Sequence, residues 1–179
     1  KAEPKFKSIY GLSKITAESY VKAYYQKYKM KYNIIRYFNV YGEDQRHDFV
    51  ISKFTRNIKK NKNLTVYGDG GQIRSFCHVN DAVAGTLEII RRANFNTTYN
   101  VGNNLEPISM IKLAKKMIKI SKKNIGIDKI NFKDSDRTQE REIFKRIPDI
   151  SKITRDTKYK PKNTLESEIK SFYKKYGVK

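Results

Sequence analysis

The sequence predicts an α/β fold organised around a parallel sheet. Apolar side chains recur at helical spacing between residues 11 and 31, which indicates a long helix early in the chain. Residues 32–38 follow directly, and their β-branched and aromatic side chains are typical of a strand. A helix that leads into a buried strand is the pattern of a parallel sheet. Ligands bind such sheets beyond the carboxyl ends of the strands, and Asn39 falls at such an end.

Further helices and strands alternate along the rest of the chain. We expect helices over residues 49–60, from 80 or 81 to 92, over 110–121 and from 165 to 176. We expect strands over residues 64–67, 72–79, 98–101 and 130–132. Residues 68–71 form a glycine turn, and residues 134–147 have no clear period.

Polar residues before three of these helices are suited to cap them. Ser109 and Thr164 are predicted N-caps, either Asn80 or Asp81 caps the helix that ends at Arg92, and Gly177 is the expected stop of the last helix. The apolar face of that helix is predicted from its spacing to carry Val83, Leu87 and Ile90.

Composition limits the class of protein. The chain has 179 residues, which fits one domain or part of a larger one. A single cysteine, Cys77, rules out a disulfide within the chain and fits a reducing, cytoplasmic compartment. No apolar run is long enough to span a membrane and no signal peptide is visible. With only His47 and His78 beside this one cysteine, no metal site is supported.

The formal net charge of +21 raises the question of a nucleic-acid partner. The lysines are spread over nearly every polar segment, which fits a general compositional bias as well as it fits a binding patch. The densest cluster, residues 59–62, coincides with a predicted helix end, where cations are favourable against the helix dipole. Nucleic-acid binding is therefore the disfavoured interpretation.

Tyr10 and Lys14 are the first candidates for chemistry. They are four residues apart at the start of the long helix, so both side chains leave the same face one turn apart. An ammonium beside a phenol favours the phenolate, which can then exchange a proton with a substrate near neutral pH. The alternative interpretation is an ordinary exposed pair, because tyrosine and lysine are both abundant in this chain.

The motifs around this pair resemble the extended short-chain dehydrogenase/reductase family, and most closely its nucleotide-sugar 4-epimerases. They occur in the family's order and at about its spacing over essentially the whole chain. They are Tyr10-Gly11-x-Ser13-Lys14, Arg36-Tyr37-Phe38-Asn39-Val40-Tyr41-Gly42, Val66-Tyr67-Gly68-Asp69-Gly70, Gln72-x-Arg74-x-Phe76, Tyr99-Asn100-Val101-Gly102 and Arg146-x-Pro148-Asp149.

The resemblance implies a fold, a cofactor and a reaction. The fold would be an incomplete Rossmann-like parallel sheet with a smaller C-terminal α/β substrate-binding domain. Residues 1–45 would belong to the NAD-binding domain and residues 46–179 mainly to the sugar-nucleotide region, with 72–101 partly returning to the sheet. The reaction would invert the 4-hydroxyl of a UDP-hexose or UDP-N-acetylhexosamine by transient oxidation with NAD.

The resemblance also implies roles for individual residues. Tyr10 and Lys14 would be catalytic and would contact the cofactor, as would Phe38. The residues implied to bind the sugar nucleotide are Asn39, Val66, Tyr67, Arg74, Arg146 and Asp149. The chemistry agrees for three of them, because two arginines suit a diphosphate and a carboxylate accepts from the ribose diol.

Several of the substrate residues also have a simpler structural interpretation. Asn39 is a common turn-former, the glycine turn after Tyr67 could be a plain hairpin, and Asp149 could simply cap the following helix. Two positions depart from the family pattern, which usually has proline at Ser52 and aspartate at Ser75. The contacts near these two positions are therefore open.

Two features of the family are absent from the sequence. They are the glycine-rich turn that cradles the cofactor pyrophosphate and the catalytic serine or threonine before the tyrosine. We therefore expect a C-terminal half that lacks the N-terminal half of the Rossmann domain and is inactive alone. By resemblance, the 11–31 helix would form a homodimer interface.

Three further functions stay open. A nucleotide-sugar dehydratase or decarboxylase of the same family would carry its distinguishing residues mostly in the absent half. A non-catalytic binding or interaction module would bind UDP without redox chemistry, or not at all. A nucleic-acid-binding protein would lose affinity steeply with salt and would not be competed by UDP.

Overall fold

The computed structural model describes residues 9–132 and 143–178. The fold is α/β, as predicted, and most of its strand pairs are parallel. In chain order the helices and strands are α1 (Ile9–Tyr28), β1 (Asn33–Tyr37), β2 (Val40–Tyr41), α2 (Val50–Lys59), β3 (Leu64–Tyr67), β4 (Ile73–Arg74), β5 (Cys77–His78), α3 (Val79–Arg92), β6 (Thr97–Val101), β7 (Ile108–Ser109), α4 (Met110–Ser121), β8 (Ile127–Ile130), β9 (Lys145–Arg146), α5 (Ser151–Thr157) and α6 (Leu165–Tyr176).

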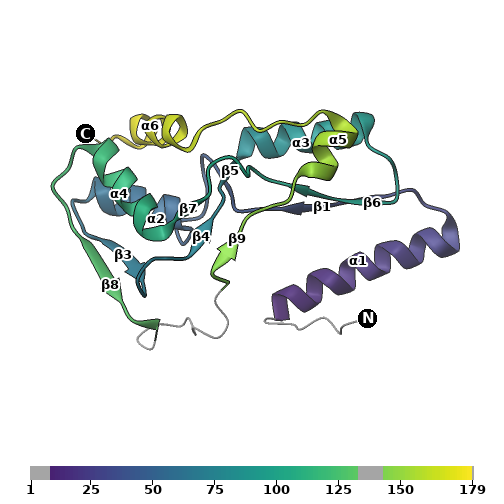
Figure 1. Ribbon diagram of the computed structural model, residues 1–179, viewed down its shortest axis with the longest axis horizontal. Helices are drawn as coiled ribbons and strands as arrows, with labels where there is room; N and C mark the ends of the chain where they lie inside the picture. The colour runs from purple at the N-terminus through teal and green to yellow at the C-terminus, as the bar shows by residue number, and fades with distance from the viewer. Residues whose placement is uncertain (1–8, 133–142, 179) are drawn as a thin grey trace.

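The elements gather into two lobes (Figure 1). In the first, which we call the strand lobe, β1 and β6 form a parallel pair that is covered on one face by α3 and α5. In the second, the helical lobe, α2, α4 and α6 pack together beside the parallel pair β3–β8. Helix α1 lies on the side of β1 away from α3. The short pairs β2–β5 and β4–β9 lie between the two lobes.

Each lobe has its own cluster of buried apolar side chains. The cluster of the helical lobe is the larger, and Phe54, Ile58, Leu113 and Ile169 are among its members. The predicted stripe of α4 contributes to it, since Leu113 and Met117 are fully buried. The cluster of the strand lobe joins β6, α3 and α5 to Cys77 and the segment after α5.

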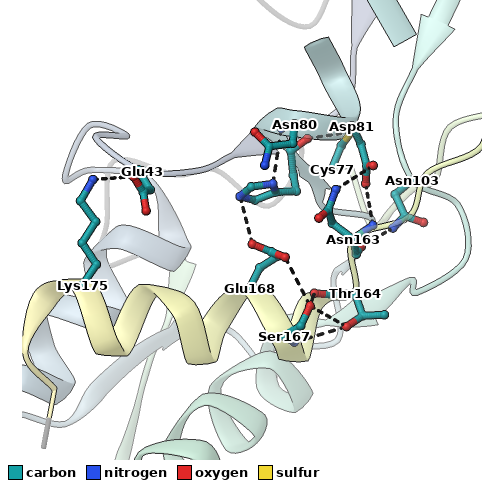
Figure 2. A network of polar contacts seen from close by, with 11 residues as sticks. Glu43, Cys77, Asn80, Asp81, Asn103, Asn163, Thr164, Ser167, Glu168 and Lys175 are labelled. Atoms are coloured by element: carbon teal, nitrogen blue, oxygen red, sulfur yellow. Dashed lines mark hydrogen bonds and ion pairs between the residues drawn. The ribbon is translucent and has the colours of Figure 1, made fainter. Parts of the chain in front are cut away.

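Two buried groups at the start of α3 join the lobes. The carboxylate of Asp81 accepts hydrogen bonds from the backbone N–H of Lys162, at 3.0 Å. It also accepts from the backbone N–H and the Nδ2 of Asn163, at 3.1 and 2.8 Å (Figure 2). His78 Nε2 lies 3.3 Å from a carboxylate oxygen of Glu168 on α6. These contacts hold the C-terminal segment across both lobes.

Several predicted boundaries and caps are confirmed. Helices α2 and α4 and strand β3 lie within a residue of the expected ranges. Ser109 and Thr164 cap α4 and α6, each accepting from a backbone N–H three residues on. Gly177 ends α6, as predicted, and its backbone is left-handed, with φ of 63°.

The first helix is shorter than predicted. It ends at Tyr28 and not at residue 31, because Lys29 adopts a left-handed conformation with φ of 56°. The expected apolar face of this helix is also largely exposed, and none of its twenty described residues is buried. Val21 and Tyr25 are half-buried.

The expected strand 72–79 is two separate strands. Its first part, β4, pairs with β7 and β9, whereas its second part, β5, pairs with β2. The chain therefore passes from one sheet to another between Arg74 and Cys77. The strand predicted over 130–132 lies earlier, as β8, because Ile127 and Ile130 are the residues in register with the ends of β3.

The prediction for α3 is wrong in its cap, and the predicted apolar face of this helix is exposed. The N-cap is His78, whose Nδ1 accepts the backbone N–H of Asn80 at 3.4 Å, and not Asn80 or Asp81. The stripe of Val83, Leu87 and Ile90 is exposed, with exposed fractions of 52, 41 and 69%. The side chains of α3 that are buried belong to Asp81, Ala82 and Ile89.

Helix α3 turns this stripe outward because Tyr159 and Val101 approach its other side closely at Gly85. A Cβ at this position would lie 3.0 Å from the ring of Tyr159 and 3.0 Å from Val101. The narrow side of α3 therefore faces the core, and the more apolar side faces outward. Spacing alone identifies an apolar stripe but does not tell which neighbour covers it.

Candidate functional site

Tyr10 and Lys14 share one face of the first turns of α1, as their spacing predicted. The ammonium nitrogen of Lys14 lies 5.4 Å from the centroid of the Tyr10 ring. Both side chains are exposed, Tyr10 by 71%. In the described residues the phenolic oxygen of Tyr10 makes no hydrogen bond, so it is available to a substrate.

The carboxyl end of β1 is fixed by hydrogen bonds to two other segments. The backbone N–H of Phe38 donates to the carbonyl oxygen of Val101 at 3.0 Å. Asn39 has a left-handed backbone, with φ of 41°, and its Nδ2 donates to the carbonyl oxygen of Ser75 at 2.8 Å. Asn39 is therefore a turn residue that also ties β1 to the segment after Arg74.

Arg74 and Arg146 are brought together by strand pairing. They are register partners in the parallel pair β4–β9, although they are far apart in the sequence. Side chains of register partners point to the same face of a sheet. Arg74 Nη1 donates to the carbonyl oxygens of Ile73 and Ile143, at 2.9 and 2.6 Å, and Arg146 is exposed.

Asp149 lies at the start of α5, a few residues after Arg146. Its Oδ1 accepts the backbone N–H of Ser151 at 2.9 Å, and its backbone carbonyl accepts from Asn100 Nδ2 at 3.0 Å. Hydrogen bonds from Ser151 hold the pKa of this carboxyl below its ordinary value. The carboxylate is therefore ionised near neutral pH on an exposed side chain, and its bond to Ser151 lies at the first residue of α5, whose N-cap position is Ile150.

Val66 and Tyr67 lie at the end of β3. Val66 is buried and its side chain belongs to the core of the helical lobe, so a ligand could meet only the backbone there. The ring of Tyr67 is half-buried, and the Lys53 ammonium lies 5.9 Å from its centroid. The glycine turn that follows is not a hairpin, because β3 pairs with β8 and β4 pairs elsewhere.

The turn after Tyr67 requires glycine at two positions. Gly68 and Gly70 have φ of 62° and 74°, which residues with a side chain rarely adopt. A Cβ on Gly68 would lie 2.6 Å from the ring of Phe132, so this ring covers the turn. The close approach of backbone and ring gives the end of β3 a fixed shape.

The predicted site residues therefore form four groups. The strand pair β4–β9 and the start of α5 carry Arg74, Arg146 and Asp149. The first turns of α1 carry Tyr10 and Lys14, and the end of β3 carries Val66 and Tyr67. Phe38 and Asn39 lie at the carboxyl end of β1, and Asn39 is bonded to the backbone of Ser75, the neighbour of Arg74.

A cavity of about 280 Å³ lies apart from these groups, between α3 and α6. Its lining is Glu43, His78, Val79, Asn80, Glu168, Ser171 and Phe172. Three of these side chains are already paired: His78 with Glu168, and Glu43 with Lys175 on α6, which lies outside the lining (Figure 2). Across the described ranges 9–132 and 143–178, no three histidine, cysteine or acidic side chains cluster as metal ligands would.

Sequence reasoning missed one contact of the candidate site. Glu18 on α1 forms an ion pair with Arg36 on β1, through two hydrogen bonds of 2.6 Å each. A signal for it was present in the sequence, because Tyr10, Lys14 and Glu18 follow each other at intervals of four residues. Opposite charges on a helix and the next strand are common, however, and spacing does not select the partner.

A search for membrane spans gave a negative result for the described residues. None of their helices is both long and apolar enough to cross a bilayer.

Comparison with known proteins defines the class. The model of the NAD dependent epimerase/dehydratase family matches residues 1–102, more than half of the chain. The chain belongs to this family.

Individual relatives fall on two branches of the family. Over 108 residues, 60% of this chain and 31% of the other, it is 35% identical to the human dTDP-D-glucose 4,6-dehydratase. Over 169 residues, 91% of this chain and 51% of the other, it is 34% identical to the putative UDP-glucose 4-epimerase of Methanocaldococcus jannaschii. The chain thus spans between about a third and a half of the length of these relatives.

A solved structure agrees with both the fold and the sequence. The crystal structure of UDP-glucuronic acid 4-epimerase from Bacillus cereus, in complex with UDP-glucuronic acid and NAD, matches with a TM-score of 0.85 at 26% identity. The match covers 96% of this chain and 53% of that protein. The Rossmann-like character of the parallel strands is thereby confirmed.

Proposed function

We propose that this chain carries the catalytic pair and the sugar-nucleotide-binding region of an NAD-dependent nucleotide-sugar 4-epimerase. The observation that carries the proposal is the pairing of Arg74 with Arg146 in β4–β9, with Asp149 directly after it. Two guanidinium groups on one face of a sheet suit a diphosphate. The likeness to an epimerase that binds UDP-glucuronic acid and NAD supports the same assignment.

Tyr10 and Lys14 are assigned the proton transfer. The Tyr10 phenolate accepts the proton of the sugar 4-hydroxyl and returns it after the configuration has changed. The Lys14 ammonium favours the phenolate and donates hydrogen bonds to hydroxyl groups of the cofactor. The exposed phenol next to a cation fits this work. Bound NAD supplies the reversible two-electron chemistry that inversion at a carbinol carbon requires.

The fit of this chain to NAD is one-sided. Tyr10, Lys14 and Phe38 would hold the nicotinamide end: the first two are exposed polar groups on one face of α1, and Phe38 directly follows β1. The sequence contains no glycine-rich turn that could cradle the pyrophosphate. We propose that the region of its relatives that this chain does not match supplies this cradle.

The remaining residues are assigned to the nucleotide. Arg74 and Arg146 bind the diphosphate, and the carboxylate of the exposed Asp149 accepts from the ribose hydroxyls. Asn39 contacts the sugar nucleotide through its amide. The backbone at Val66 and the ring of Tyr67 face the base.

The proposal divides the chain between two functional regions. Residues 1–45 belong to the NAD-binding domain, and residues 46–179 mainly bind the sugar nucleotide, with 72–101 partly returning to the sheet. The parallel pairing of β6 with β1 supports this return.

Exposed apolar faces suggest two further contacts of the whole protein. On α1, Tyr20, Tyr24 and Tyr28 form an exposed stripe at intervals of four residues, which we assign to a homodimer interface. The exposed stripe of α3 and the second edge of β1 are assigned to contacts with the unmatched half of the NAD-binding domain. We place the reaction in the cytoplasm, where a free buried cysteine such as Cys77 is usual.

A second candidate function is a nucleotide-sugar 4,6-dehydratase. The 35% identity with the human dTDP-D-glucose 4,6-dehydratase favours it over a decarboxylase of the same family. Both the epimerase and the dehydratase would use Tyr10 and Lys14 in the first step, so the residues of this chain do not separate them.

The test is turnover by the natural full-length protein with NAD. UDP-glucose, UDP-glucuronic acid, UDP-N-acetylglucosamine and dTDP-glucose are supplied separately, and the products are identified by NMR. We expect the 4-epimer of one UDP-sugar as the product. Tyr10→Phe should lower kcat by about 10³-fold or more, because it removes the proton acceptor, while UDP affinity changes less than twofold. Tyr20→Phe on the same helix is the control and should retain full activity.

Each contrary outcome assigns a different function. A 4-keto-6-deoxy sugar would identify a dehydratase. Binding of UDP without any turnover would identify a non-catalytic module, and salt-sensitive binding of nucleic acid that UDP does not compete would identify a nucleic-acid-binding protein. Full activity of Tyr10→Phe would contradict the proposed mechanism itself.

A further inference from the structure

The ion pair between Glu18 and Arg36 has a geometry that can fix helix α1 against strand β1. Arg36 Nε donates to Glu18 Oε1 and Arg36 Nη2 donates to Glu18 Oε2, both at 2.6 Å. This is the bidentate arrangement in which a guanidinium fixes a carboxylate in distance and in orientation. The ion pair shifts the pKa of both groups. The hydrogen bond from Arg36 lowers the pKa of Glu18, and the bond to Glu18 raises the pKa of Arg36.

Helix α1 depends on such an ion pair for its position more than the other helices do. None of its twenty described residues is buried, so packing in this chain restrains it weakly. Near its C-terminal end, the rings of Tyr25 and Tyr32 meet edge-on at 5.9 Å between centroids. The ion pair lies closer to the N-terminal end, where the catalytic pair is found.

The spacing along α1 links the Glu18–Arg36 ion pair to the catalytic pair. Tyr10, Lys14 and Glu18 are separated by steps of four residues, and each step turns only about 40° around an α-helix. An anchor at Glu18 therefore fixes the rotation of the face that carries Tyr10 and Lys14. It also fixes the position of α1 along its axis, because Glu18 lies about 12 Å from Tyr10 on a rigid helix.

The second residue of the ion pair lies on the strand that leads into the site. Arg36 belongs to β1, two residues before Phe38 and three before Asn39. These residues are held in turn by the bonds of Phe38 to Val101 and of Asn39 to Ser75. A continuous set of contacts thus runs from the catalytic helix to the strand end where the sugar nucleotide is proposed to bind.

We propose that Glu18 and Arg36 are a positioning pair, which sets the Tyr10–Lys14 face against the carboxyl end of β1. The proposal deepens the proposed function and rests on it for the identity of the catalytic pair. The competing interpretation is a surface ion pair without consequence, which is the usual value of such a contact. The two differ in what happens to the first turns of α1 when the pair is broken.

The first test measures the position of α1 and does not depend on the reaction. Amide hydrogen exchange is followed across α1 in the full-length protein and in its Glu18→Gln and Arg36→Lys variants. We expect exchange in residues 11–20 to become about tenfold faster in both variants, because Arg36→Lys keeps the charge but loses the bidentate geometry. The charge-swapped double variant Glu18→Arg with Arg36→Glu should return to within threefold of the wild-type rates.

A second ion pair of the chain provides the matched control. Glu88 and Arg92 form an ion pair of 3.0 Å within α3, with exposed fractions similar to those of the first pair. Glu88→Gln should leave exchange in α1 unchanged. Unchanged α1 exchange in Glu18→Gln and Arg36→Lys would overturn the proposal.

The second test uses turnover to show positioning of the catalytic pair. Glu18→Gln and Arg36→Lys should each lower kcat about 10–100-fold while KM for the sugar nucleotide stays within twofold. The charge swap should recover a large part of the lost kcat. Equal losses in the Glu88→Gln control would mean that general destabilisation is responsible.

The two tests separate this proposal from the proposed function. A wild-type protein that turns over no nucleotide sugar would contradict the function, while the exchange measurement would still decide whether the pair holds α1. An active wild-type protein whose variants show normal kcat would contradict the positioning role alone.

Discussion

The helical lobe and helix α1 differ in how completely they bury their apolar side chains. In the helical lobe, Phe54, Ile58 and Leu113 are exposed by 2% or less and pack into one cluster. On α1, Tyr10, Tyr20 and Tyr28 are each exposed by more than half, and none of the described residues of this helix is buried. The helical lobe thus completes its own core, whereas α1 presents apolar surface suited to contacts with other surfaces.

This contrast fits the division of labour that we propose. The residues assigned to the nucleotide lie at the edge of the packed region, on β3, β4, β9 and the start of α5. The residues assigned to catalysis lie on the exposed helix, which depends on Glu18 and Arg36 for its place. Nucleotide binding should therefore tolerate changes that abolish turnover.

The largest expected effect is at the centre of the helical lobe. Phe54→Ala should lower the free energy of unfolding by about 3–5 kcal/mol, because it removes a buried ring and leaves a cavity. Tyr24→Ala on α1, with an exposed ring, should cost less than about 1 kcal/mol. Urea unfolding of both variants measures the difference. Similar losses in the two variants would mean that α1 is packed as tightly as the lobe.

The next effect concerns the bonds of Asp81 to the C-terminal segment that crosses both lobes. Asp81→Ala should cost about 2–3 kcal/mol, because three donors of Lys162 and Asn163 lose their buried acceptor. Glu88→Ala, on the same helix but in a surface ion pair, should cost no more than about 0.5 kcal/mol. Thermal unfolding of the pair of variants compares them. Equal midpoints of thermal unfolding in the two variants would show that the position of the C-terminal segment does not depend on Asp81.

A smaller effect should appear in alkaline solution. Burial raises the pKa of the Cys77 thiol from its ordinary value of 9.0 to about 11, so the folded state binds this proton more tightly than the unfolded state does. The contribution to stability is complete below pH 9 and is lost as the pH rises from 9 toward 11. Cys77→Ala should therefore show a shallower fall of stability over this range in urea titrations. An identical slope in both proteins would mean that the thiol does not titrate differently on folding.

The smallest effect on stability is expected on the exposed stripe of α3. Leu87→Ser should change the free energy of unfolding by less than about 0.5 kcal/mol, because the side chain already meets solvent. It should, however, lower self-association of this chain in sedimentation velocity, since the stripe is apolar. If Leu87→Ser destabilises the chain by several kcal/mol, the stripe is part of the core after all.

The sequence predicted features that depend on local chemistry. The caps at Ser109 and Thr164 and the stop at Gly177 follow from side-chain hydrogen bonding and from the freedom of glycine, and all three are present. The joint face of Tyr10 and Lys14 likewise follows from helical spacing. Each of these needs only a few consecutive residues.

Features that depend on distant neighbours were predicted less well. The apolar stripe of α3 faces outward because Gly85 lets Tyr159 approach the other side. His78 takes the cap position because β5 ends there, and the Glu18–Arg36 contact joins two elements whose packing spacing does not reveal. The meeting of Arg74 with Arg146 was implied by resemblance to the family, and strand register supplies its physical cause.

The measurement that tests the central claim most directly is a calorimetric titration of this chain with UDP and, separately, with NAD. We predict saturable binding of UDP that is weakened at least tenfold by Arg146→Ala, and no comparable binding of NAD, because the chain holds the residues assigned to the nucleotide but no pyrophosphate cradle. Lys174→Ala, an exposed cation on α6, serves as the control and should leave UDP binding unchanged. Tight binding of NAD, or UDP binding that is indifferent to Arg146, would contradict the account.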